Sequence, residues 1–407
     1  MASNTSASNI NTRLHGLDFL RALMMTLGIV LHGAQMYMTM HLGFDYYRDP
    51  VMSMTMDGVL IFINTFRMPV FFTLSGFFTA MLLVRYGLNG MLTQRVMRIA
   101  LPFLIFLPPL SLILGVQWIA SSQLSATGSL GMDASYLSNP RALWDNTHHL
   151  WFLYYLMMLL LITAAIAYAW QGAPSSIKQR ATVLGNKLQG EGVGYVIVLG
   201  LLIGWIALPR YFGRVNGAPW FIPYVPAVLT FGLCFLTGWL LYFRQSCLDV
   251  LANRCWKYLG AAMLCFCAAL YAFLNQGEPD GPAYVRLHPI LAFGNGLAVA
   301  FFIAGFTGLF HRYYNHYRPR VRYFSDASYW IFMLHQPVLI FLAWPMHSWA
   351  IAAELKFLIV SLGTLAISVW TYDIFVRNSA IGALLNGRRY SRGLPRLHGH
   401  PPSTHVH

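Results

Sequence analysis

The chain has 407 residues, of which 57% are hydrophobic and only 10% are charged. Soluble domains usually carry about 25% charged residues, so this composition excludes an ordinary soluble protein and predicts a polytopic membrane protein. The formal net charge of +14 could suggest nucleic-acid binding, but the basic residues lie between apolar runs and form no nucleic-acid-binding module. We therefore expect the lipid bilayer, and no nucleic acid, as a partner.

Runs of about 20 apolar residues predict ten membrane-spanning helices. They cover residues 17–38, 58–84, 99–119, 150–170, 193–208, 224–243, 257–275, 288–310, 327–346 and 352–376. With the N-terminus in the cytoplasm, most of the 27 Lys and Arg residues fall on the cytoplasmic side. Because cytoplasmic loops are enriched in Lys and Arg, this bias places both termini in the cytoplasm. The expected fold class is all-α, with about ten transmembrane helices.

We divide the chain into a cytoplasmic N-terminal tail over residues 1–16, a transmembrane domain over 17–376 and a basic cytoplasmic tail over 377–407. No removable signal peptide is expected, because the first apolar run has full span length and contains charged residues. From Asn378 on, the chain is rich in Gly, Arg and His, which predicts a disordered tail. The five cysteines form no CxxC pair, so we expect neither a metal site nor a structural disulfide.

The first predicted helix contains three ionisable residues, Asp18, Arg21 and His32. An Arg or Asp at mid-depth of a bilayer costs roughly 3 kcal/mol or more, so it needs a partner, water or a function. Arg21 and His32 are separated by close to three helical turns, so both project to one side, with Gly28 between them. They lie roughly 16 Å apart along the axis, so this helix can serve chemistry at two depths.

Three further arginines have positions that suggest a role. Arg67 lies in the second predicted helix just before Pro69, which lacks an amide hydrogen and clashes with the preceding turn. We therefore expect a kink or break there with a polar cavity beside Arg67, or else an Arg67 that snorkels to the outer surface. Arg95 and Arg98 share a helical face at the inner boundary, where they can clamp phosphates, although the positive-inside rule alone also supplies such a pair.

Histidines open the fourth predicted helix and lie inside the ninth. His149 and Trp151 stand where the fourth helix begins, which is typical of a membrane-surface anchor or of a substrate contact. His335 lies at mid-membrane and is followed by the helix-distorting Pro337. Any one of these residues alone could be a satisfied core polar group. Two deep histidines and a deep arginine in three helices together indicate a functional centre.

Five stretches of the chain, in order and spacing, resemble the membrane acyltransferase family called acyltransferase 3. They are LDFLRALMMTLGIVLH, RMPVFFTLSGFF, RVMRIALP, HLWFL and ASYWIFMLHQP. The resemblance covers nearly the whole chain. It implies a ten-helix inner-membrane enzyme that takes an acyl group from a cytoplasmic donor, usually an acyl-CoA, and delivers it to a carbohydrate hydroxyl in the periplasm. Within the family, the chain is similar to a branch associated with succinyl transfer to osmoregulated periplasmic glucans.

The resemblance also implies roles for individual residues. The first-helix histidine of the family falls on His32 and its preceding arginine on Arg21, and the RxxR pair linked to the acyl donor falls on Arg95 and Arg98. Recurrent family positions with less settled roles fall on Arg67, His149 and His335.

Acyl transfer to a sugar hydroxyl needs a base, because a hydroxyl is a poor nucleophile at neutral pH. We expect neutral His32 to be that base, with Arg67 or His335 stabilising the oxyanion or fixing the His32 tautomer. The expected donor, succinyl-CoA or acetyl-CoA, would bind through its phosphates, and no tightly bound cofactor is expected. The expected acceptor is a periplasmic glucan or another glycan near His149 and Trp151. Direct attack and an acyl-His32 intermediate both stay open.

A polytopic secondary transporter is the main alternative from another class. In such a protein the buried histidines and arginine would line a path for protons or anions. The RxxR pair, the HLWFL stretch and the ASYWIFMLHQP motif of the ninth predicted helix distinguish the two hypotheses, because a carrier has no stated need for them. A catalytically idle partner in glycan export is a third possibility.

Overall fold

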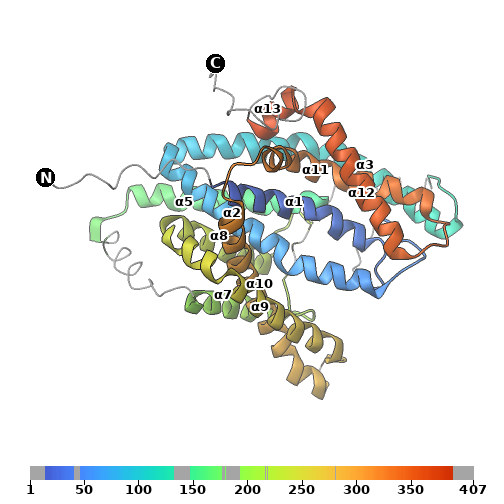
Figure 1. Cartoon of the computed structure of the whole chain (residues 1–407), viewed down its shortest axis with the longest axis horizontal. Helices are drawn as coiled ribbons and strands as arrows, with labels where there is room; N and C mark the ends of the chain where they lie inside the picture. Colours follow the sequence, from blue (N-terminus) through green and yellow to red (C-terminus); the bar gives the residue numbers. More distant parts are fainter. Residues whose placement is uncertain are drawn as a thin grey trace.

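The computed structural model describes residues 14–40, 46–132, 147–176, 179, 193–215, 217, 219–279 and 281–387, and helices joined by loops make up this part (Figure 1). The long helices are α1 (His15–Gln35), α2 (Met54–Arg95), α3 (Leu101–Thr127), α5 (Trp151–Gln171), α7 (Val193–Ala207), α8 (Val225–Phe243), α9 (Ser246–Asn275), α10 (Pro282–Tyr314), α11 (Pro319–Ala343) and α12 (Ala353–Thr371). The shorter elements are the π-helices η1 (Val96–Ala100) and η5 (Tyr372–Val376), the 3-10 helices η3 (His148–Leu150) and η4 (Trp344–Met346), and α13 (Ala380–Asn386).

The all-α membrane fold class is confirmed. Within the described residues, eight helical stretches are long and apolar enough to cross a membrane. One of these, Met54–Thr127, contains both the second and the third predicted spans, while the fifth predicted span corresponds to the shorter apolar helix α7. The exact number of crossings and the cytoplasmic placement of the termini stay predictions.

Helix α2 does not break at Pro69, so the expected break is absent, while the expected kink stays a prediction. Helical backbone continues through Pro69, whose carbonyl accepts a hydrogen bond from Thr73 Oγ1 at 2.9 Å. The helix as a whole packs against α1, α8 and α10. The interruption comes instead at Gly87 (φ 68°, ψ −177°), a backbone conformation that only glycine adopts without strain.

The end of the described chain also differs from the expectation. Residues that follow Asn378 form the short helix α13 instead of a disordered start to the tail. Ser379 caps this helix by accepting a hydrogen bond from the Gly382 amide, and Leu385 is buried beneath it. Residues 388–407, like residues 1–13, lie outside the described residues, so the tail prediction concerns mainly residues that the structure does not describe.

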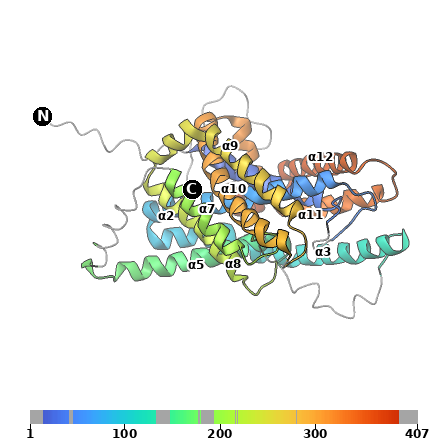
Figure 2. The same cartoon turned by 90° about the horizontal axis from the view of Figure 1, so that it is seen from below.

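Helix α1 lies in the middle of the bundle, where it contacts α2, α10, α11 and α12 (Figure 1). On another side of the molecule, α9 and α10 lie side by side, with α7 next to α10 (Figure 2).

The contact between α2 and α8 depends on small residues. A Cβ atom on Gly76 would lie 1.9 Å from the Phe235 carbonyl oxygen, and one on Gly238 would lie 1.7 Å from the Thr73 carbonyl oxygen. Such close backbone contact is how membrane helices gain packing energy.

A buried ion pair fixes the segment before α2 against α12. The Lys356 ammonium lies 2.8 Å and 3.0 Å from the two carboxylate oxygens of Asp49, and both side chains are fully buried. The Tyr47 hydroxyl donates to the same carboxylate at 3.0 Å. Burial, together with the neighbouring Asp49 charge, raises the pKa of Tyr47 and keeps this phenol protonated as a donor. The ion pair therefore ties the connection between α1 and α2 to the far end of the bundle.

Candidate active site

Three histidines from three separate elements meet next to α1. The ring centroid of His335, on α11, lies 5.2 Å from that of His32 on α1 and 5.0 Å from that of His149 on η3. His335 and His149 are buried, whereas His32 is half-buried. The structure therefore brings together three histidines that lie far apart in the sequence, and we call them, with Arg67, the histidine cluster.

Arg67 completes this cluster from α2. Its Nε donates a hydrogen bond to the Met24 carbonyl of α1 at 3.1 Å, and its side chain is only 5% exposed, so it does not snorkel to the surface. Gly28 makes the approach possible. A Cβ atom there would lie 3.1 Å from His335 Nε2 and 3.4 Å from Arg67 Nη2. The absent side chain lets a guanidinium and an imidazole from two other helices meet at α1.

Hydrogen bonds fix which ring nitrogen of two histidines can accept a proton. His335 Nδ1 lies 2.6 Å from the Phe332 carbonyl oxygen, and His32 Nδ1 lies 3.2 Å from Gln35 Oε1. Because these oxygens only accept, each Nδ1 carries a hydrogen and each Nε2 has a free lone pair. His335 Nε2 is buried and has no hydrogen-bond partner among the described residues. The cluster thus presents imidazole bases beside a buried cation.

The position of His149 depends on its neighbours along the chain. His148 has φ 48°, the only positive φ of a non-glycine residue in the described part, and its Nδ1 is hydrogen-bonded to the Tyr46 hydroxyl. Such a conformation costs of order 1 kcal/mol or more and persists where tertiary contacts hold it. It directs His149 against the Phe332 ring, with centroids 5.3 Å apart. The sequence pattern gave no sign of this strained turn.

Helix α11 stays continuous through Pro337, so the proline changes the hydrogen bonds of the helix without ending it. Proline cannot donate to the carbonyl four residues earlier, which is that of Met333. This carbonyl lies beside His149. The carbonyl of Pro337 itself accepts a hydrogen bond from Gln117 Nε2 at 2.8 Å. The proline therefore places a carbonyl without its helical donor next to the histidine cluster.

Arg21, Arg95 and Arg98 line one large cavity of about 1010 Å³, which we call the arginine cavity. Arg85 and Arg322 also line it. Arg95 Nη2 donates to Thr79 Oγ1 at 2.8 Å, while Arg98 belongs to the π-helix η1, a geometry that is frequent at functional sites. Five guanidinium groups around one cavity make it suited to a ligand with several negative charges.

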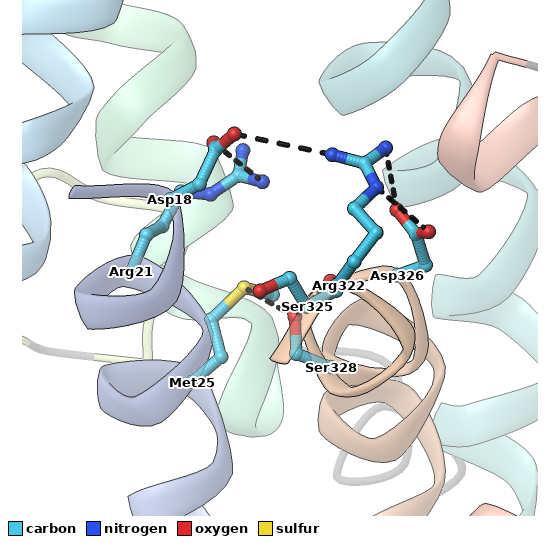
Figure 3. A network of polar contacts seen from close by, with 7 residues as sticks. All are labelled: Asp18, Arg21, Met25, Arg322, Ser325, Asp326 and Ser328. Atoms are coloured by element: carbon cyan, nitrogen blue, oxygen red, sulfur yellow. Dashed lines mark hydrogen bonds and ion pairs between the residues drawn. The ribbon is translucent and has the colours of Figure 1, made fainter. Parts of the chain in front are cut away.

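An ion-pair network at this cavity joins α1 to α11 (Figure 3). Asp18 lies between two arginines, with one carboxylate oxygen 3.7 Å from Arg21 Nη2 and the other 4.0 Å from Arg322 Nη1. Arg322 also binds Asp326 through two contacts of 2.8 Å and 3.0 Å. Analysis of the sequence missed the pair on α11, although the i,i+4 spacing of Arg322 and Asp326 is a recognisable signal.

The arginine cavity and the histidine cluster share one face of α1. Asp18, Arg21 and Met25 line the cavity, and Gly28 and His32 continue the same face into the cluster. The cavity also reaches Phe71 and Leu153, which lie one helical turn beyond Arg67 and His149 respectively. The cavity therefore ends about one turn from the cluster, as the positions of Arg21 and His32 on one helix face predicted.

Trp151 lies apart from the histidine cluster. Its ring packs on Phe231 of α8, with centroids 5.6 Å apart, and lines a small pocket of about 40 Å³. Gly217 presses against the ring, since a Cβ atom there would lie 2.1 Å from it. Among the described residues, no group of three or more His, Cys, Asp or Glu side chains could hold a metal ion.

Comparison with known proteins assigns this arrangement to a recognised domain. A family model described as an acyltransferase domain, acyltransferase 3, matches residues 14–373. Two relatives named Glucans biosynthesis protein C, from Escherichia coli O157:H7 and Shigella dysenteriae serotype 1, are each 28% identical over 385 residues, covering 92% of this chain and 95% of the relative. No solved structure matches the chain.

Proposed function

Because the chain belongs to the acyltransferase 3 family and is a multi-pass membrane acyltransferase, we propose that it transfers an acyl group from a cytoplasmic acyl-CoA to a hydroxyl of a periplasmic glycan. The membrane is the bacterial inner membrane. The acyl group is succinyl or acetyl, and the acceptor is an osmoregulated periplasmic glucan. The names of the relatives support a glucan as the acceptor.

One observation carries this proposal: α1 places the arginine cavity and the histidine cluster on the same face. The cavity lies around Arg21, and the cluster lies around His32, roughly 16 Å farther along the axis. A donor bound by its phosphates at one end can extend its acyl chain along this face toward the imidazoles. The acceptor hydroxyl then reaches the thioester from the opposite side of the bilayer.

In the proposed reaction, a neutral His32 acts as the base and the positively charged Arg67 stabilises the oxyanion. His32 Nε2 takes the proton of the acceptor hydroxyl as the hydroxyl oxygen forms a bond to the thioester carbon. Negative charge develops on the carbonyl oxygen, and the Arg67 guanidinium stabilises it. The carbon–sulfur bond then breaks, and the departing CoA thiolate takes the proton from the His32 imidazolium. His335 and His149 form the wall that orients His32 and the acceptor.

The donor would be held by charge-assisted hydrogen bonds. Arg21, Arg95 and Arg98 line a cavity large enough for part of a nucleotide, and guanidinium groups bind phosphate oxygens in a bidentate manner. Asp18 and Asp326 neutralise some of this positive charge. Donor phosphates would therefore compete with two carboxylates for the same guanidinium groups.

The direct test is His32→Ala in membranes supplied with radiolabelled acyl-CoA and glucan. We expect at least a hundredfold loss of label on glucan, because the general base is removed, with acyl-CoA binding unchanged. His316→Ala, which alters an exposed histidine outside the cluster, is the matched control. Wild-type turnover by the His32 variant would remove His32 from the catalytic role.

Two further readouts separate the competing mechanisms. Incubation with donor alone, followed by mass spectrometry, shows an acylated His32 peptide only if transfer proceeds through a covalent intermediate. Uptake of free substrate into sealed vesicles, without label on polysaccharide, would favour the transporter instead.

A further inference from the structure

A second cation lies in the Trp151 pocket, away from the histidine cluster. Arg214 lines this pocket together with Asn64, Thr230 and Asn295. The pocket lies between α2, α7, α8 and α10, on faces of these helices that do not contribute to the arginine cavity. The proposed transfer chemistry assigns Arg214 no role, so its charge requires a separate explanation.

Within the described residues, Arg214 forms no ion pair with a carboxylate. None of the described residues that line the pocket is Asp or Glu. The Nε of Arg214 is buried and has no hydrogen-bond partner among the described residues. Burial lowers the pKa of Arg214 to about 10, which still leaves the guanidinium charged at neutral pH. Arg214 is half-buried, and a partly desolvated cation without a nearby carboxylate would be stabilised by an incoming anion.

The pocket also holds a polar group that lacks a partner. Thr230 is only 4% exposed, and its hydroxyl makes no hydrogen bond with the described residues. A hydroxyl can donate to an anionic oxygen as readily as a guanidinium can. Arg214 and Thr230 thus offer two sets of donors to one small space.

The backbone beside Arg214 is held firmly. The side-chain amide of Asn295, a buried residue on α10, donates to the Gly213 carbonyl at 3.1 Å. The backbone amide of Gly213 donates to the Arg210 carbonyl at 2.7 Å. Gly213 has φ 53° and lies so close to α10 that a Cβ atom would be 2.4 Å from Leu291 Cγ. These contacts place Arg214 before any ligand arrives, which is what a binding site requires.

The size of the pocket limits what it can accept. Its volume of about 40 Å³ leaves room for about two or three groups the size of a water molecule. A carboxylate or phosphate group fits this space, whereas a whole sugar ring does not. The Trp151 ring forms one wall of this space.

We infer that the Trp151 pocket is a binding site for a single anionic oxygen group, a carboxylate or a phosphate, held by Arg214 and Thr230. The group comes either from a substituent on the acceptor glycan or from a free small anion. The glycan alternative rests on the proposed function, whereas anion binding itself does not.

Anion binding is tested on the full chain purified in detergent. Thermal unfolding is followed while sodium succinate, or separately sodium phosphate, is titrated at constant ionic strength. We expect a saturable rise in Tm for the wild type and for Arg286→Gln, which removes an exposed arginine outside the pocket. In Arg214→Gln, the concentration giving half of the rise should increase at least tenfold, and Arg214→Lys should lie between the two.

The inference is overturned if the wild type shows no saturable rise with either anion, or if Arg214→Gln responds as the wild type does. A transfer assay then separates the two sources, using a neutral oligosaccharide and the same oligosaccharide carrying a carboxylate. A KM raised at least tenfold by Arg214→Gln for the charged acceptor alone assigns the group to the glycan. An unchanged KM for both acceptors, together with lost anion binding, assigns it to a free anion. Absence of transfer to any acceptor would refute the proposed function and leave the Tm result intact.

Discussion

Gly28 offers a perturbation whose effects on activity and on stability should have opposite signs. In Gly28→Ala, the new methyl group would lie 3.1 Å from His335 Nε2 and 3.4 Å from Arg67 Nη2. Ordinary contact between heavy atoms begins at about 3.5 Å, so the imidazole must move by about 0.4 Å. Reactive groups have to be held within about 0.5 Å of their productive positions, and a shift of about 1 Å costs roughly a hundredfold. We therefore expect kcat to fall about tenfold, or about 1.4 kcal/mol.

The stability of the same variant should not fall. Alanine in a helix interior is favoured over glycine by about 0.5–1 kcal/mol, and this gain offsets the small repacking at Gly28. Gly58→Ala in α2 and Gly260→Ala in α9 are matched controls, because an added Cβ atom meets nothing within 4 Å at either position. Both controls should raise or preserve Tm with unchanged kcat.

The assay compares initial rates of label transfer from acyl-CoA to glucan with thermal unfolding of the same purified proteins. If Gly28→Ala retains kcat within twofold of the wild type, the close approach at α1 has no bearing on the chemistry. If Gly28→Ala instead loses both Tm and kcat, the glycine serves packing alone.

Three other variants test separate parts of the structure. Lys356→Met should destabilise the protein by about 3–5 kcal/mol in detergent unfolding, because it leaves the Asp49 carboxylate buried without a counterion, and adding Asp49→Leu should recover part of the loss. His148→Gly should retain at least tenfold more transfer activity than His148→Val, since only glycine adopts φ 48° without strain. Gly387→Ala should raise the donor KM, because its Cβ atom would lie 2.0 Å from a guanidinium of the arginine cavity, whereas Gly128→Ala, with the same φ of 73° and open space, should not.

Much of the architecture follows from the composition, because a bilayer forces every long apolar run to satisfy its own backbone as a helix. Helical periodicity also placed Arg21, Gly28 and His32 on one face of α1, and the structure confirms that placement. These are properties of single helices. A 3.6-residue repeat determines them without reference to the rest of the chain.

Properties that depend on how helices meet could not be predicted from the sequence. His149 and Trp151 are two residues apart and point to opposite sides, as a helical repeat requires, but which partners they meet, His335 and Phe231, depends on how the helices pack. Similarly, Pro69 suggested a kink or break in α2, yet helical backbone continues through it in a helix that packs against α1, α8 and α10. The sequence could not indicate a role for Arg214, because the residues that surround it in the pocket come from several separate helices.

Met25, Phe71 and Leu153 lie between the arginine cavity and the histidine cluster, and each is less than 10% exposed. If transfer crosses an energised membrane as proposed, these apolar side chains would form a barrier to ions between the two sites. Their apolar surfaces offer no hydrogen-bonding groups that would conduct protons, and the thioester arm of the proposed donor would have to pass between them to reach His32. The space between these three side chains would then limit the size of the acyl group that the enzyme can deliver. The affinity of the arginine cavity for the donor would not set this limit.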